Sequence, residues 1–166
     1  MKTNITALMN LISEVENNFA MNLYNIKNYT FNTSTEELDG KVNIIEDNKE
    51  DFDYCLNNLE KSNKELSKLK SILYEKNNEF KLSDGRTIQE AIVDNQNLRK
   101  LKNCYEQLLI SKNTKKRFTE VNNSYFECKT INFDQKEIRK KLEEIENTIQ
   151  NTDFEISKLN SIEFEV

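Results

Sequence analysis

The chain has 166 residues, of which 36% are hydrophobic and 32% charged, and its formal net charge is −5. It has two glycines and no proline, histidine or tryptophan. The length fits one domain that buries roughly 70% of its unfolded surface. Because tight turns and phosphate loops depend on glycine and proline, the composition excludes turn-rich all-β folds and glycine-rich nucleotide sites. Without histidine, the chain lacks the commonest general base and the commonest metal ligand.

The compartment is indicated by the N-terminal residues and by the cysteines. The residues after Met1 mix polar and apolar types, which is not the pattern of a secretory signal, and no run approaches the ~18 apolar residues of a membrane span. Cys55, Cys104 and Cys128 are odd in number and widely spaced, as is typical of reduced proteins. We therefore expect a cytoplasmic protein without a membrane segment.

Charge is unevenly distributed along the chain. Residues 1–60 carry a net charge of −7, residues 61–118 carry +7, and residues 119–166 carry −5. A basic middle between acidic ends indicates either contact with nucleic acid or helices that pair through complementary charge. In a heptad-patterned chain the second interpretation is the simpler one.

Two long helices are predicted in the first half. Apolar residues recur at three- and four-residue spacing over 5–29, where Asn22 is the single polar member. Asn22 either sets the register of the seam or lies near its exposed edge. A seven-residue apolar register from Leu38 to Phe80 predicts a second helix over 36–77, which starts at the capping-box spacing of Ser34 and Glu37 and has a kink or break near 46–51.

The second half is predicted to alternate helices with short strands. Alternation near 79–82 indicates a strand, followed by a turn and a capped helix over 88–112. Residues 115–131 lose helical periodicity and predict a loose hairpin around 122–124. A last helix over 135–159 and a strand near 162–166 complete the chain.

These elements predict one domain over residues 1–166. Four helices of similar length with short connections favour antiparallel neighbours. We therefore predict an all-α, antiparallel four-helix coiled-coil bundle, with a short β hairpin or paired short strands at the helix ends. The strands near 79–82 and 162–166 would pair with each other at one pole.

One segment resembles a known family. The resemblance is carried by the run LSDGRTIQEAI at 82–92, Leu98 with Arg99, the run NNSYF at 122–126 and the closing helix at 149–160. Over about residues 78–166 the chain resembles a group of small bacterial coiled-coil proteins labelled septicolysin-like, whose function is unassigned. The resemblance implies a cytoplasmic, helical, self-associating protein and supplies no catalytic residue. The label suggests a cytolysin, but an export signal and a tryptophan-rich loop are both absent from the sequence.

No catalytic, metal or cofactor site is expected. The cysteines form no Cys-x-x-Cys pair, and the carboxylates do not follow the spacing of a calcium loop. Cys104 and Cys128 lie close to lysines, yet no base stands beside them to activate a thiol. Paired acids such as Glu143 and Glu144 fall on a predicted helix surface. The predicted protein is therefore not an enzyme.

One cluster has the residue types of a binding surface. Its candidate residues are Lys112, Lys115, Lys116, Arg117, Tyr125 and Phe126. Cations neutralise phosphates, and aromatic rings stack on unpaired bases. In the competing interpretation the aromatic residues form the small core of a hairpin, and the cations meet acidic helices.

The sequence therefore predicts a non-enzymatic, self-associating coiled-coil scaffold or interaction protein. A homodimer is the favoured state, and a further protein partner is an additional option. The alternative function is nucleic-acid binding through residues 112–129.

Overall fold

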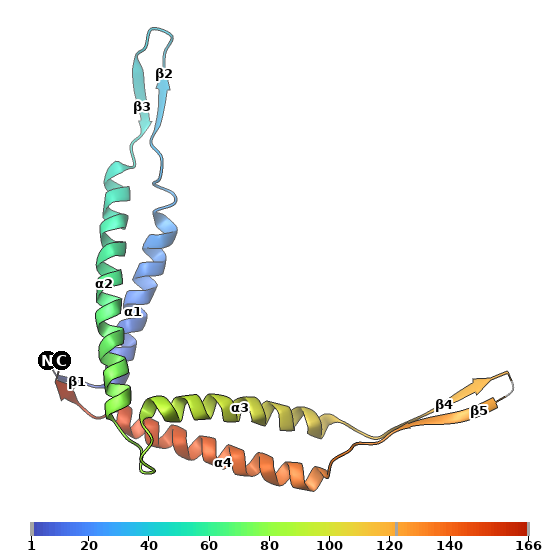
Figure 1. Ribbon diagram of the computed structural model, residues 1–166. Coiled ribbons are helices and arrows are strands. Elements are labelled where there is room, and N and C mark those ends of the chain that lie inside the picture. Colours follow the sequence, from blue (N-terminus) through green and yellow to red (C-terminus); the bar gives the residue numbers. More distant parts are fainter. Residues whose placement is uncertain (1, 122, 166) are drawn as a thin grey trace. The chain divides into compact units, whose positions relative to one another are not determined.

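The computed structural model describes residues 2–121 and 123–165 (Figure 1). The helices in this part are α1 (Ile5–Asn25), α2 (Lys49–Glu79), α3 (Ile88–Ile110) and α4 (Gln135–Asn160). The strands are β1 (Lys2–Thr3), β2 (Thr33–Glu36), β3 (Val42–Glu46), β4 (Thr114–Glu120), β5 (Asn123–Lys129) and β6 (Phe164–Glu165). Within the described residues they form three two-stranded antiparallel sheets: β1 with β6, β2 with β3, and β4 with β5.

The chain forms two compact units with the same order of elements. The first unit comprises Met1–Glu79 with Asn160–Val166, and the second comprises Phe80–Leu159. In the first, α1 and α2 lie side by side and the β2–β3 hairpin connects their ends (Figure 1). In the second, α3 and α4 lie side by side and the β4–β5 hairpin connects them. Each unit is thus a helix, a β hairpin and a returning helix.

The first unit has a small apolar core. The side chain of Asn4 accepts a hydrogen bond from the Ala7 backbone N–H at 2.8 Å and so caps α1. The core consists of buried Leu8, Ile12, Val15 and Leu69, against which Leu66, Ile72, Leu73 and Phe164 pack. At about 1.5–3 kcal/mol for each fully buried aliphatic side chain, this cluster is the main apolar contribution in the described part of the helix pair.

The two ends of the described chain meet in the first unit. Lys2 pairs with Glu165 and Thr3 with Phe164, which forms the β1–β6 sheet. The Lys76 ammonium lies 5.2 Å from the centroid of the Phe164 ring. Strand pairing therefore joins the C-terminal segment to β1, and a cation–π contact joins it to α2.

The turn before α3 has the expected chemistry. The Gly85 N–H donates to the Leu82 carbonyl at 3.0 Å, and Gly85 has a φ of +89°, a region that glycine adopts without strain. The Thr87 hydroxyl then accepts from the Glu90 N–H, while the Glu90 carboxylate accepts from the Thr87 N–H. The capping box predicted here is confirmed.

The predicted all-α four-helix bundle is wrong. The fold is a mixed α/β arrangement of helices in two pairs with three two-stranded sheets in the described part. The second helix was placed over 36–77 but begins at Lys49, because residues 33–46 form the β2–β3 hairpin. Val42, Ile44 and Ile45 are β-branched, which favours a strand. The predicted capping box at Ser34 is also wrong, since Ser34 lies in β2.

The predicted pairing of the strands near 79–82 and 162–166 is wrong as well. Strand β6 pairs with β1, and α2 continues to Glu79. Lys81 forms only an isolated bridge with Thr87, because the turn at 82–86 folds the chain back on itself. Val166, the last residue of the predicted strand, lies outside the described residues.

Candidate functional site

The sequence-predicted binding residues gather on the β4–β5 hairpin. Lys115, Lys116 and Arg117 lie in β4, Tyr125 and Phe126 lie in β5, and Lys112 precedes β4. The two strands are antiparallel, with Arg117 opposite Phe126 and Phe118 opposite Tyr125. A hairpin was predicted over 115–131, and its strands span Thr114–Lys129; Asn122 of the predicted turn lies outside the described residues.

The strand register divides the hairpin into two unlike faces, because successive strand residues point to opposite sides. The first, here called the basic face, carries Lys115, Arg117, Thr119, Ser124, Phe126 and Cys128. The second, the mixed face, carries Thr114, Lys116, Phe118, Glu120, Asn123, Tyr125, Glu127 and Lys129. The basic face has two cations and, among these residues, no carboxylate, whereas two carboxylates balance the two cations of the mixed face.

Aromatic rings lie on both faces. On the basic face, the Lys115 ammonium is 4.4 Å from the centroid of the Phe126 ring. On the mixed face, the Phe118 and Tyr125 rings stack with centroids 5.6 Å apart, and Lys116 lies 4.9 Å from the Phe118 centroid. The structure therefore brings together Lys115, Arg117 and Phe126 but places Lys116 and Tyr125 on the other side.

The hairpin aromatics are not a buried core. Phe126 is 55% exposed and Tyr125 is 44% exposed, and Phe118 is half-buried. The interpretation of these rings as core anchors is therefore wrong. A hairpin with only two strands has one layer, so both of its faces meet solvent.

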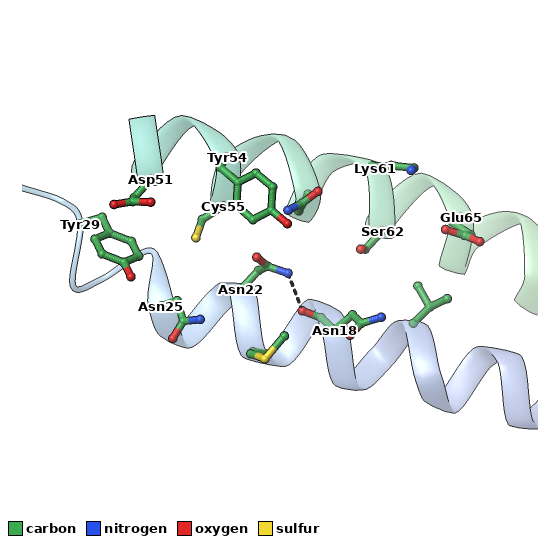
Figure 2. A pocket seen from close by; sticks show the side chains of 13 residues that line it. Asn18, Asn22, Asn25, Tyr29, Asp51, Tyr54, Cys55, Lys61, Ser62 and Glu65 are labelled. Atoms are coloured by element: carbon green, nitrogen blue, oxygen red, sulfur yellow. Dashed lines mark hydrogen bonds between the residues drawn. The ribbon is translucent and has the colours of Figure 1, made fainter. Parts of the chain in front are cut away.

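A second site, missed from the sequence, is a polar cavity of about 460 Å³ between α1 and α2. Figure 2 shows Asn22 pointing from α1 toward α2, where it lies close to Tyr54 and Cys55. The Asn22 amide donates to the Asn18 carbonyl at 2.8 Å, and the side chain is only 9% exposed. Other lining residues are Asn25, Tyr29, Asp51, Asn58, Lys61, Ser62 and Glu65.

This cavity begins where the apolar core ends. Past Val15, the seam position of Asn22 is polar, and a carboxamide there cannot close an apolar contact. In the sequence, this polar cavity is indicated by Asn18, Asn22 and Asn25, whose spacing of four and three residues places them on one face of α1. The side chains that line the cavity supply both hydrogen-bond donors and hydrogen-bond acceptors. In the described residues, no group of three or more cysteine, aspartate or glutamate side chains is placed to hold a metal ion.

The α3–α4 pair is polar along one side. Arg99 donates two hydrogen bonds to the Asp153 carboxylate at 2.9 and 2.7 Å, and Asn95 donates to the same carboxylate at 2.8 Å. The Lys102 ammonium lies 2.9 Å from Glu146, and this hydrogen bond raises the pKa of Lys102. These contacts join the two helices near their middle.

Next to these contacts, the seam between the two helices is apolar and incompletely covered. Leu98, Leu101, Tyr105 and Leu108 share one face of α3, because they follow at three- and four-residue spacing, as do Ile138, Leu142 and Ile145 on α4. None of these seven side chains is buried: Leu101 is 40% exposed and the other six are half-buried. We call this set the open apolar face.

The comparisons with known proteins give a family without an assigned role. The sequence model described as "Family of unknown function (DUF6847)" matches residues 37–162. Neither the curated proteins nor the solved structures include a match. The match does not test the resemblance to septicolysin-like proteins, which stays a prediction. Among the described residues, no helix is long and apolar enough to cross a membrane.

Proposed function

The chain belongs to the DUF6847 family, and from that premise we propose that it is a self-associating, non-enzymatic interaction protein. In this proposal a second copy covers the open apolar face of α3 and α4. The observation that carries it is the incomplete burial of seven large side chains along the seam of one helix pair. Exposed apolar patches that polar residues border are typical of interaction sites.

The energetics favour self-association. Completing the burial of a large apolar side chain contributes roughly 25 cal/mol per Å² of area removed from water. The Arg99–Asp153 and Lys102–Glu146 ion pairs already satisfy the charged groups between the helices, so the open apolar face beside them is the surface that gains apolar burial from a partner. A twofold arrangement uses the same face on both copies, so each residue contributes twice.

Solution mass tests this proposal. Light scattering from low to high micromolar protein, at low and high salt, should give about twice the mass of the 19.7 kDa chain. Leu101→Glu combined with Ile145→Glu should reduce the mass to that of one chain, because two like charges would be buried at the contact. Val93→Glu is the matched control, since Val93 is a 45% exposed apolar residue outside the open apolar face. A one-chain mass for the wild type at every concentration contradicts the proposal.

Nucleic-acid binding through the β4–β5 hairpin is the second candidate function. The basic face favours it, since Lys115 and Arg117 have no carboxylate beside them on that face. It ranks second because the predicted set of six residues is split between two faces, which leaves Phe126 as the single ring beside those two cations. Salt-dependent binding of single-stranded RNA that disappears with Lys115→Glu and Arg117→Glu would raise it above self-association.

We also propose a cytoplasmic location. The support is the thiol state, since Cys55, Cys104 and Cys128 are all free cysteines. Proteins that keep free thiols, two of them exposed here, suit a reducing compartment. Cell fractionation with an antibody to the chain tests this assignment.

A further inference from the structure

The two β hairpins carry opposite charge. Residues 33–47, here called the acidic hairpin, contain Glu36, Glu37, Asp39, Glu46 and Asp47 against Lys41 alone. Residues 112–129, the basic hairpin, contain Lys112, Lys115, Lys116, Arg117 and Lys129 against Glu120 and Glu127. Their net charges are −4 and +3. Surfaces of opposite charge steer association and set its register.

The acidic hairpin also presents apolar side chains to solvent. Every residue from Phe31 to Asp47 is exposed. Val42 and Ile44 lie on one face, where Glu36 is opposite Val42 and Ser34 is opposite Ile44. We call this the acidic–apolar face. It combines a carboxylate with two β-branched residues that have no apolar cover.

Each hairpin is a separate two-stranded sheet in the described part of the chain. A single two-stranded hairpin is marginally stable in water unless it packs against another layer. The acidic hairpin offers apolar groups and a negative charge, and the basic hairpin offers an aromatic ring beside two cations. The two surfaces are therefore complementary in charge, and both offer apolar groups that can pack together.

We propose that the acidic–apolar face of one copy docks on the basic face of a second copy. In this contact Glu36 meets Lys115 and Arg117, while Val42 and Ile44 pack on Phe126. The inference rests on the proposed self-association and names a second contact surface for it, in addition to the open apolar face. A nucleic acid fits less well, because stacking on successive bases uses several rings on one face, whereas Tyr125 stacks on Phe118 on the other side.

A cross-linking experiment between two populations tests the contact. Both carry Cys104→Ser, and the buried Cys55 stays in place. The first population carries Ser34→Cys and Cys128→Ser, so its accessible thiol lies on the acidic–apolar face. The second keeps the exposed Cys128 on the basic face. A short bis-maleimide should then join the two populations into covalent pairs.

Charge reversal supplies the decisive comparison. Lys115→Glu with Arg117→Glu in the second population should reduce the pair yield about tenfold or more, because like charges then face each other. Adding Glu36→Lys to the first population should restore the yield. The matched control, Lys116→Glu with Lys129→Glu on the mixed face, should leave the yield unchanged. Circular dichroism confirms that each variant is folded.

Four outcomes overturn the proposal. These are an absent cross-link, a yield that charge reversal does not change, a reversal that Glu36→Lys does not repair, and loss of cross-linking when single-stranded RNA that binds the same cations is added before the bis-maleimide. Light scattering on the same samples separates this test from that of the proposed function. A mass of two chains without cross-linking contradicts the hairpin contact and leaves the open apolar face as the contact. Cross-linking together with a mass that Leu101→Glu and Ile145→Glu do not change contradicts the contact through the open apolar face alone.

Discussion

Glu155 accepts two hydrogen bonds from Ser83, one from its backbone N–H at 2.9 Å and one from its hydroxyl at 2.8 Å. Ser83 lies in the turn before α3 and Glu155 lies in α4, so the pair joins the start of the second unit to its last helix. The two bonds from Ser83 lower the pKa of the Glu155 carboxyl. Charge on this carboxylate therefore stabilises the folded state.

This relationship predicts a pH dependence. A lowered folded-state pKa gives stability that is present above the ordinary glutamate value of 4.5 and lost as the pH falls below it. Glu155→Gln should lower the melting temperature at pH 7 and flatten its decline as the pH falls below about 5. Thermal melts followed by circular dichroism at stepped pH measure both effects. Glu143→Gln, at an exposed position of α4, should change neither, and equal curves for the two variants would disprove the role of Glu155.

The cost of replacing Gly85 should depend on how readily the new residue adopts a positive φ, and not on the volume of its side chain. Its φ is +89°, and a Cβ placed there would meet no heavy atom within 4 Å. Gly85→Val should cost about 1–3 kcal/mol through strain, because β-branched residues avoid positive φ. Gly85→Asn should cost less, since asparagine enters this region more readily. Urea unfolding gives both values, and an equal cost for the two variants would contradict the conformational argument.

Asn95 should not tolerate a carboxylate. Its side chain is 1% exposed, and its amide donates to Asp153 at 2.8 Å. Asn95→Asp preserves shape but places a second negative charge beside Asp153, which should destabilise by about 3 kcal/mol or more at pH 7. Because protonation removes this repulsion, the deficit should shrink as the pH falls toward 4. Asn97→Asp, at an exposed position of the same helix, is the control. A deficit that does not change with pH would exclude charge repulsion as the cause.

The hairpin aromatics should contribute less to stability than the core of the first unit. Tyr125→Ala removes an exposed ring from a stacked pair and should cost about 0.5–1.5 kcal/mol. Leu8→Ala removes a buried side chain and should cost about 2–5 kcal/mol. Chemical denaturation of both variants checks the order. A larger loss for Tyr125→Ala would show that the hairpin is buried in solution by a partner.

The helices α3 and α4 could be placed from the sequence because local signals agree there. Apolar spacing covers α4, and the Thr87–Glu90 capping box marks the start of α3. The β4–β5 hairpin was also placed, since residues 115–131 combine aromatic residues with a loss of helical period. What the pattern could not show was which residues share a face, because that depends on the strand register.

The seven-residue apolar register runs through the β2–β3 hairpin, so the pattern predicts a helix where the chain forms two strands. Leu38 and Ile45 are seven residues apart and fit a helix, yet both are exposed, and Leu38 lies in the hairpin loop. The stronger signal was Asp39 followed by Gly40, a turn pair, and Gly40 has a φ of +85°. The β1–β6 sheet could not be predicted, since each strand has two residues and its pairing joins opposite ends of the sequence.

The discontinuity of the first unit has a consequence for the order of events during synthesis. Phe80–Leu159 is a continuous stretch, so the ribosome translates the whole second unit before it reaches Asn160–Val166 of the first unit. A ribosome adds about 5–20 residues per second, and short-range helix and hairpin contacts form far faster than that. Strand β1 and the Lys76 ammonium have no β6 to contact until the ribosome has translated the whole inserted unit. Strand β1 therefore pairs only after the whole second unit has been translated.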